Sequence, residues 1–161
     1  MIVTLPAPNI QEAQGKVCGH KLTPTSREAL KKLKELVPRL RDLGVTKVIS
    51  SDLDAQSGEY LARKLHVPNE EWESLRRVNA GKWHGTPTSA FLELWESLPK
   101  AEVPVKGGDS KASFEKRVAH SKQRLVDVGN ALVILDKGVF QAMFGTAAVQ
   151  PYHIYEVERG S

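Results

Sequence analysis

The sequence predicts one α/β domain in which helices cover both faces of a mostly parallel central sheet. Two uninterrupted apolar runs, KVIS within residues 45–51 and ALVIL at residues 131–135, are typical of strands buried on both sides. Amphipathic helical patterns alternate with these runs, which indicates a three-layer α/β/α architecture. The length of 161 residues suits a single domain, which we assign to residues 1–159. Gly160 and Ser161 are interpreted as a remnant of recombinant expression.

The first quarter of the chain supplies a strand, a connection and the start of a helix. Residues 2–5 form a short β-prone run that Pro6 and Pro8 end. Residues 10–24 are polar and are interpreted as a long connection over the surface. Residues 25–28, Thr-Ser-Arg-Glu, have the spacing of a capping box, so we expect a helix to begin there.

Apolar spacing and capping residues define the remaining elements. The first helix should be kinked by Pro38 and end at Gly44. Asp109 or Ser110 should cap a long helix that ends near Asn130. The other expected elements are a strand at 45–51, a helix from 54 onward, a helix at 88–98, a Pro- and Gly-rich connection at 99–109, a strand at 131–135, a helix at 138–144 and a terminal strand at 152–157.

The composition excludes several classes of protein. The net charge of +4 weakly favours anionic partners, but most basic residues lie beside acids in helical patterns, so nucleic acid is not an expected partner. No apolar run has the length of a membrane span, and the first residues do not have the pattern of a secretory signal. We therefore expect a cytoplasmic protein without membrane association. Cys18 is the only cysteine and no Cys/His cluster has zinc-like spacing, so neither a metal nor another cofactor is expected.

Three segments should meet at one edge of the sheet, because ligands of open α/β sheets gather beyond the carboxyl ends of the strands. These segments are residues 5–9, 50–54 and 136–138. Five motifs in and between them occur in a characteristic order. They are L-T-P at 22–24, V-I-S-S-D-L at 48–53, L-R-R with G-K-W-H-G at 75–85, G-G-D-S at 107–110 and the strand end V-I-L-D-K-G-V at 133–139.

Together the five motifs resemble the histidine phosphatase superfamily, also called the phosphoglycerate mutase-like fold. The resemblance covers nearly the whole chain. It implies a nucleophilic histidine in an R-H-G motif after the first strand, but Leu-Pro-Ala-Pro at residues 5–8 stands there. It also implies an arginine after S-S-D-L, where residues 54–57 are Asp-Ala-Gln-Ser. Asp136 corresponds to the second family histidine and Arg77 to the family acid, whereas Arg76 matches a family arginine.

Asp136 replaces a group that stabilises phosphoryl charge with an anion. Two unit charges about 4 Å apart interact by roughly 4 kcal/mol at an effective dielectric constant near 20. An ionised Asp136 would weaken phosphate binding by up to about three orders of magnitude unless Lys137, Arg76 or Arg77 offset it. The structural alternative is that Asp136 caps the next helix beside a solvated Lys137, and that both arginines form ion pairs.

Ser51 and His84 also have structural interpretations. Ser51 should close a strand and cap the next helix, and His84 should pack at the rim of the pocket beside Trp83. Catalysis by Ser51, His84 and Asp136 is disfavoured, because no nucleophile-elbow pattern surrounds the serine.

We therefore hypothesise a catalytically degenerate histidine phosphatase-like protein that serves as a binding or structural module. Its partner would be a protein or an anionic ligand such as a phosphorylated molecule. The alternative is a phosphoesterase or phosphomutase with a rewired site, in which Asp136 acts as acid and base and Arg76, Arg77 and Lys137 supply positive charge. An oligomeric interaction protein with an exposed apolar surface is a third hypothesis. The candidate binding residues are Arg76, Arg77, Asp136, Lys137, Ser51 and His84.

Overall fold

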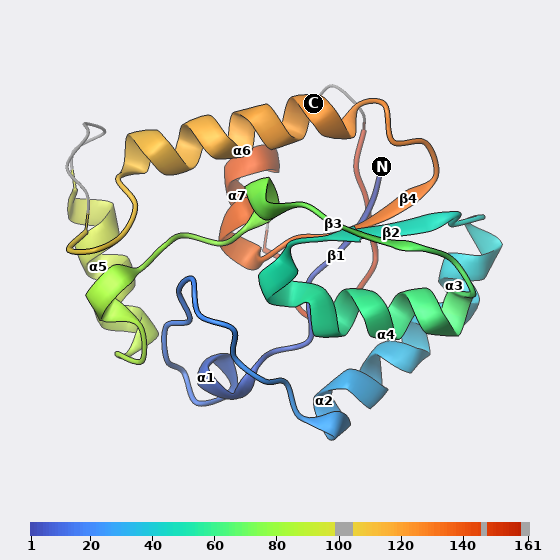
Figure 1. Cartoon of the computed structure of the whole chain (residues 1–161), viewed down its shortest axis with the longest axis horizontal. Helices are drawn as coiled ribbons and strands as arrows, with labels where there is room; N and C mark the ends of the chain where they lie inside the picture. The colour runs from blue at the N-terminus through green and yellow to red at the C-terminus, as the bar shows by residue number, and fades with distance from the viewer. Residues whose placement is uncertain (99–104, 146–147, 159–161) are drawn as a thin grey trace.

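The computed structural model describes residues 1–98, 105–145 and 148–158, and within them a five-stranded sheet lies between layers of helices (Figure 1). The strand order is β3-β2-β4-β1-β5. The strands are β1 (Ile2–Thr4), β2 (Lys47–Ser50), β3 (Asn69–Glu71), β4 (Ala131–Ile134) and β5 (Tyr155–Glu156). The helices are α1 (Ile10–Ala13), α2 (Arg27–Lys32), α3 (Val37–Asp42), α4 (Ala55–Leu65), α5 (Thr88–Ser97), α6 (Lys111–Leu125) and α7 (Lys137–Phe144).

The sheet is mostly parallel, as the sequence predicts. β4 lies between β1 and β2 and pairs in parallel with both, β3 extends the sheet in parallel beyond β2, and β5 runs antiparallel to β1 at the other edge. Because β1, β2 and β4 run in the same direction, the residues that follow them meet at one edge of the sheet. That edge carries the three segments expected to form the site.

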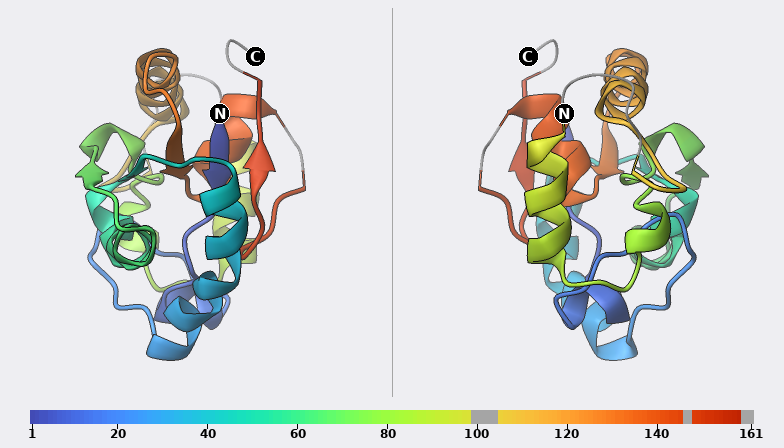
Figure 2. Two further views of the ribbon diagram at one scale, coloured as in Figure 1. Left: turned by 90° about the vertical axis from the view of Figure 1, so that its right-hand side faces the viewer. Right: turned by 90° about the vertical axis from the view of Figure 1, so that its left-hand side faces the viewer.

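Each central strand supplies residues to the cores on both faces of the sheet, which explains the uninterrupted apolar runs. In β2, Val48 packs with the α3 and α4 layer, whereas Ile49 packs with the α6 and α7 layer. In β4, Leu132 and Val133 divide in the same way. The edge-on views of Figure 2 separate the two layers, with α6 on one side of the sheet and α4 on the other.

The first predicted helix is divided into three pieces. Ser26, not Thr25, is its N-cap and accepts a hydrogen bond from the Ala29 N–H. A 3₁₀ turn at Leu33–Leu36 separates α2 from α3, and Pro38 lies in the first turn of α3. Proline has no N–H and clashes with the preceding turn, so the chain restarts the helix there instead of continuing it with a kink.

Other boundaries and elements also differ from the prediction, and the terminal strand is limited to Tyr155–Glu156. α6 begins after Ser110, as expected, but ends at Leu125 rather than near Asn130. The short edge strand β3 lies in a region without a clear pattern, and residues 10–24 contain α1 and the buried Val17 and Cys18. Residues 99–104 of the predicted connection and the tail from residue 159 lie outside the described residues.

Among the described helices, none combines the length and hydropathy needed to cross a bilayer.

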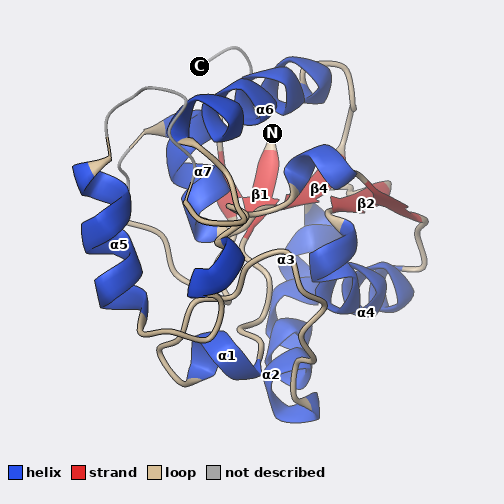
Figure 3. Cartoon of the chain, turned by 60° about the vertical axis from the view of Figure 1, so that its left-hand side comes forward, coloured by secondary structure: helices blue, strands red, loops and turns tan. Residues whose placement is uncertain are grey.

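A third apolar cluster places α5 beside the site edge (Figure 3). Its buried members come from separate segments, and half-buried aromatic residues pack against them. The Phe91 ring stacks on Trp95 with 5.9 Å between centroids, and Trp95 meets Phe114 of α6 edge-on at 6.1 Å. This aromatic row holds α5 against α6. The buried members are Val17, Ala80, Phe91 and Val105.

Candidate functional site

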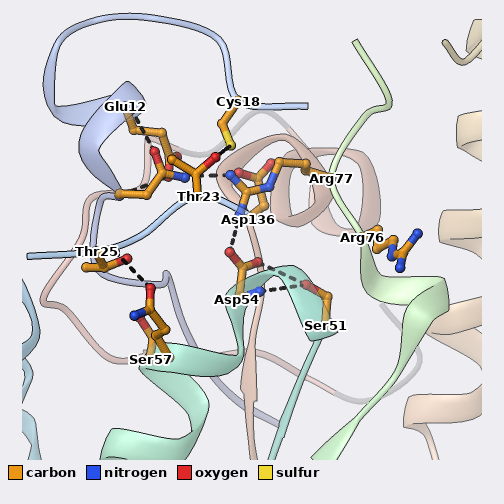
Figure 4. Close-up of polar contacts among 12 residues, drawn as sticks. Glu12, Cys18, Thr23, Thr25, Ser51, Asp54, Ser57, Arg76, Arg77 and Asp136 are labelled. Carbon is orange, nitrogen blue, oxygen red and sulfur yellow. Dashed lines mark hydrogen bonds and ion pairs between the residues drawn. The ribbon is translucent and has the colours of Figure 1, made fainter. Parts of the chain in front are cut away.

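The three strand-end segments meet as expected, and two further segments join them (Figure 4). After β1 the chain contacts the first turn of α4, where the Ala7 N–H donates to Ser57 Oγ at 2.9 Å. After β2 comes a 3₁₀ turn at Asp52–Asp54, and after β4 comes Asp136 at the start of α7. The additional segments are α1 and the chain around Arg77, so the site has five contributors rather than three.

Helix α1 brings Glu12 to this edge. Asn9 caps the helix by accepting hydrogen bonds from the N–H groups of Gln11 at 3.0 Å and Glu12 at 2.9 Å. The Glu12 carboxylate accepts from the Asn9 N–H at 3.3 Å, which completes a capping box. The reciprocal bonds turn Glu12 back toward the end of β1. The spacing Asn-x-x-Glu at residues 9–12 was the signal in the sequence for this helix.

Arg77 occupies the centre of the site and is almost entirely buried, with 5% of its side chain exposed. Its Nη2 donates to Asp54 Oδ1, and Asp54 is equally buried. Its Nη1 lies 3.5 Å from Glu12 Oε1, and Asp136 lies beside the guanidinium in Figure 4 and acts on it electrostatically. One buried cation is therefore surrounded by three carboxyl groups that come from α1, from the end of β2 and from the end of β4.

The neighbouring Arg76 points away from this cluster (Figure 4). It donates to both carboxylate oxygens of Asp52, at 2.8 and 2.5 Å, and lies 3.6 Å from Glu73. Arg117 of α6 fixes the backbone of Arg76 and Arg77, because its guanidinium donates to the carbonyl oxygens of both residues. Asp109 holds Arg117 in turn at 2.7 Å. The candidate pair Arg76 and Arg77 therefore does not act on one ligand position.

Burial and the neighbouring charges shift the pKa values in the cluster. Burial raises the pKa of Glu12 to about 7, the nearby Asp136 adds to the rise, and Arg77 opposes it. Burial also raises the pKa of Asp54 against the opposing effect of Arg77. For Arg77, burial lowers the pKa, but the carboxylates of Asp54, Asp136 and Glu12 outweigh burial and keep the guanidinium charged.

A family model for the histidine phosphatase superfamily (branch 1) matches residues 8–156, which is nearly the whole chain. The chain belongs to this superfamily. No match was found among curated proteins. Its fold is also that of solved structures with low sequence identity, and at these identities the likeness shows the fold alone.

Three of these structures illustrate the agreement. Bacillus stearothermophilus YhfR is 16% identical, with a TM-score of 0.77 over 99% of this chain and 92% of that one. TTHB049 from Thermus thermophilus is 19% identical, with a TM-score of 0.68 over 95% and 89%. The mycobacterial glucosyl-3-phosphoglycerate phosphatase Rv2419c is 14% identical, with a TM-score of 0.72 over 89% and 76%.

The remaining candidate residues of this histidine phosphatase superfamily member have structural partners. Asp136 accepts a hydrogen bond from the Gly138 N–H at 3.0 Å and caps α7, while Lys137 is exposed. Ser51 caps the 3₁₀ turn by accepting from the Asp54 N–H at 3.2 Å. His84 Nδ1 accepts from the Gly19 N–H at 3.0 Å, and burial lowers the pKa of His84. Ser51 and His84 therefore engage different partners and form no Ser-His-Asp arrangement.

A cleft of about 530 Å³ opens over the cluster. Glu12, Arg77 and Asp136 line its polar side, and the aromatic residues of α5 and α6 line its apolar side. Within the described residues, no group of three or more His, Cys, Asp or Glu side chains is arranged to hold a metal ion. Of the candidate residues, Arg77, Asp136 and Lys137 line this cleft, whereas Arg76, Ser51 and His84 do not.

Proposed function

We propose that this member of the histidine phosphatase superfamily does not transfer phosphoryl groups through histidine and uses the cleft as a binding module. The observation that carries the proposal is the buried cluster of Arg77 with Asp54, Glu12 and Asp136. The family resemblance implies a histidine where Asp136 stands and an acid where Arg77 stands. The charges at these two positions are therefore exchanged relative to the family pattern, and an acid stands at the position that would stabilise phosphoryl charge.

The absence of a nucleophile near the end of β1 supports the same proposal. Residues 5–8 carry no side chain that can attack phosphorus, and the Ala7 N–H is already bonded to Ser57. The nearest histidine in the sequence is His20, whose Nε2 lies 2.6 Å from the Arg77 carbonyl oxygen. That nitrogen is engaged with the backbone, and burial lowers the pKa of His20. A phosphohistidine intermediate therefore has no evident carrier.

The partner of the module is proposed from the groups around the cleft. Lys16, Lys111 and Lys137 line it from separate segments and provide positive charge, although acidic side chains line the same cleft. An anionic group of a ligand, or an acidic side chain of a protein partner, would be held by these lysines. The buried cluster would meet the opposite end of the same ligand.

Hydrolysis assays test the proposal directly. Purified protein is incubated with 4-nitrophenyl phosphate and with a set of sugar phosphates, and released phosphate is measured. We expect the wild-type protein to show no turnover above that of the variant Asp136→Asn. This variant retains a capping side chain but removes the carboxyl group that would act as acid and base in the rewired phosphoesterase. Turnover in the wild-type protein that disappears in Asp136→Asn, while both remain folded by circular dichroism, would support the rewired phosphoesterase and refute the binding module.

A further inference from the structure

The apolar side of the cleft provides a surface for a flat hydrocarbon group. Phe91 and Trp95 of α5 line the cleft together with Phe114 of α6, and the three rings stack or meet edge-on in one row. Leu92, 49% exposed, extends the same surface toward solvent. An aromatic or aliphatic side chain of a ligand would bury apolar area against this row.

The polar side of the cleft carries an excess of carboxyl groups. Glu12 and Asp136 line it, Asp54 lies beneath them, and Arg77 is the single cation among the three. The cleft lining as a whole carries four basic and four acidic side chains, so the preference is local. An ammonium group between Glu12 and Asp136 would be stabilised by both carboxylates, whereas a phosphate dianion at that position would be repelled by them. The charge balance of the floor therefore selects a cationic group.

Arg77 supplies a second and independent requirement. Its side chain is only 5% exposed and lines the cleft, yet Nε and Nη1 have no hydrogen-bond partner among the described residues, and Nη1 has only the long ion pair with Glu12. A buried hydrogen-bond donor without an acceptor lowers the stability of the folded protein, and an acceptor supplied by a ligand would recover that loss. A ligand that places an oxygen acceptor beside Arg77 would satisfy at least one of them.

We infer that the cleft binds a primary ammonium group adjacent to a carbonyl oxygen and an apolar side chain, as found in an amino-acid amide or a peptide amino terminus. The ammonium group lies toward Glu12 and Asp136, the carbonyl oxygen accepts from Arg77, and the side chain packs on the aromatic row. The inference rests on the proposed function, because it requires a cleft floor that is not occupied by phosphate.

Protonation of Glu12 gives the inference a second readout. Arg77, Asp54 and Asp136 are the charged groups that act on Glu12, and burial with Asp136 raises its pKa to about 7. Near neutral pH the carboxyl is therefore close to half protonated. An ammonium group beside it favours the ionised form, so binding should release a fraction of a proton to the buffer.

Isothermal titration of the full chain at pH 7 tests the inference with four probes of similar size. L-phenylalaninamide should bind at least tenfold more tightly than 3-phenylpropanamide, which lacks the ammonium group, and than phenethylamine, which lacks the carbonyl group. Phenyl phosphate should bind more weakly than all three. Titrations in buffers of different ionisation enthalpy should show proton release with phenylalaninamide. The peptide Phe-Ala-Ala distinguishes the sources, since tighter binding than the amide indicates a peptide amino terminus and weaker binding a small molecule.

A matched pair of variants separates the cleft from general charge effects. Asp136→Asn keeps a capping side chain for α7 and should weaken phenylalaninamide binding at least tenfold. Asp127→Asn removes the same charge from an exposed position outside the cleft and should change binding less than twofold. Equal binding by wild type and Asp136→Asn, tighter binding of phenyl phosphate, or no binding of either ammonium-carbonyl probe would overturn the inference. Any of these results without phosphatase activity leaves the proposed function standing.

Discussion

Replacing Arg77 with methionine tests whether the buried ion pair stabilises the site. Methionine retains an unbranched apolar side chain but removes the guanidinium. Asp54, with 4% of its side chain exposed, would retain the Ser51 hydroxyl at 3.3 Å as a partner but lose its counter-charge. Breaking a buried pair by removing one partner costs about 3–5 kcal/mol of unfolding free energy.

Protonation of Asp54 sets an independent limit on this loss. To become neutral at pH 7, the carboxyl must bind a proton about three pH units above the usual aspartate pKa near 3.9, and each unit corresponds to about 1.36 kcal/mol. The part of the loss that comes from Asp54 should therefore reach at most about 4 kcal/mol at pH 7. In the variant the folded-state pKa of Asp54 lies above its unfolded value, so stability is lost as the pH rises. At pH 5 the loss should shrink to about 1.5 kcal/mol.

Urea unfolding followed by tryptophan fluorescence at pH 5 and pH 7 measures both quantities. Arg76→Met is the matched control, because Arg76 is partly exposed and its pairs with Asp52 and Glu73 should contribute about 0–1 kcal/mol. If Arg77→Met is too unstable to study at pH 7, the double variant Asp54→Leu/Arg77→Met should recover at least half of the loss. Equal losses in the two arginine variants, or a loss that does not change with pH, would refute the reasoning.

Three further substitutions test other parts of the structure. In the wild type, the raised pKa of Glu12 stabilises the fold at low pH, and this stability is lost as the pH rises from about 4.5 through about 7. Glu12→Gln should therefore flatten the fall in unfolding free energy over this range. The exposed Glu35→Gln should keep the wild-type slope in the same urea titrations. Gly58→Ala should lower the unfolding free energy measured in urea by about 1–3 kcal/mol, since the new Cβ would lie 2.6 Å from Ser50 Oγ. Adding Ser50→Ala should recover part of the loss. A single variant that is more stable than the wild type would contradict this packing. Asp136→Ala should lower the unfolding free energy by about 0.5–2 kcal/mol, because it removes the cap of α7. Asp136→Asn should have an unfolding free energy close to that of the wild type. Equal losses in the two Asp136 variants would assign the effect to the lost charge instead of the lost cap.

The sheet and its functional edge could be predicted because they depend on local patterns. The runs KVIS and ALVIL identify strands that supply both cores, and parallel pairing then places their carboxyl ends together. The family resemblance identified residues 77 and 136 as positions of altered charge. These inferences needed only residue type and spacing.

The buried cluster could not be predicted in the same way. Glu12 lies in a polar stretch without apolar periodicity, and its helix is visible only through the short capping pattern that begins at Asn9. Arg77 pairs with acids 23 and 65 residues earlier in the chain, and no spacing rule connects such positions. Arg76 is identical in type and adjacent in sequence, yet it points elsewhere because the Arg117 guanidinium fixes the two carbonyl groups.

The exchanged charges at residues 77 and 136 also limit the order in which this site can change during evolution. Replacing Asp136 with histidine alone would leave Arg77 paired with Asp54 and Glu12, whereas replacing Arg77 with glutamate alone would leave four acids together. A buried unpaired charge costs about 3–5 kcal/mol, which is a large part of the roughly 5–15 kcal/mol that stabilises a typical domain. A change at residue 77 that came before one at residue 136 would therefore produce a poorly folded intermediate, so the cluster restricts the order of the two changes.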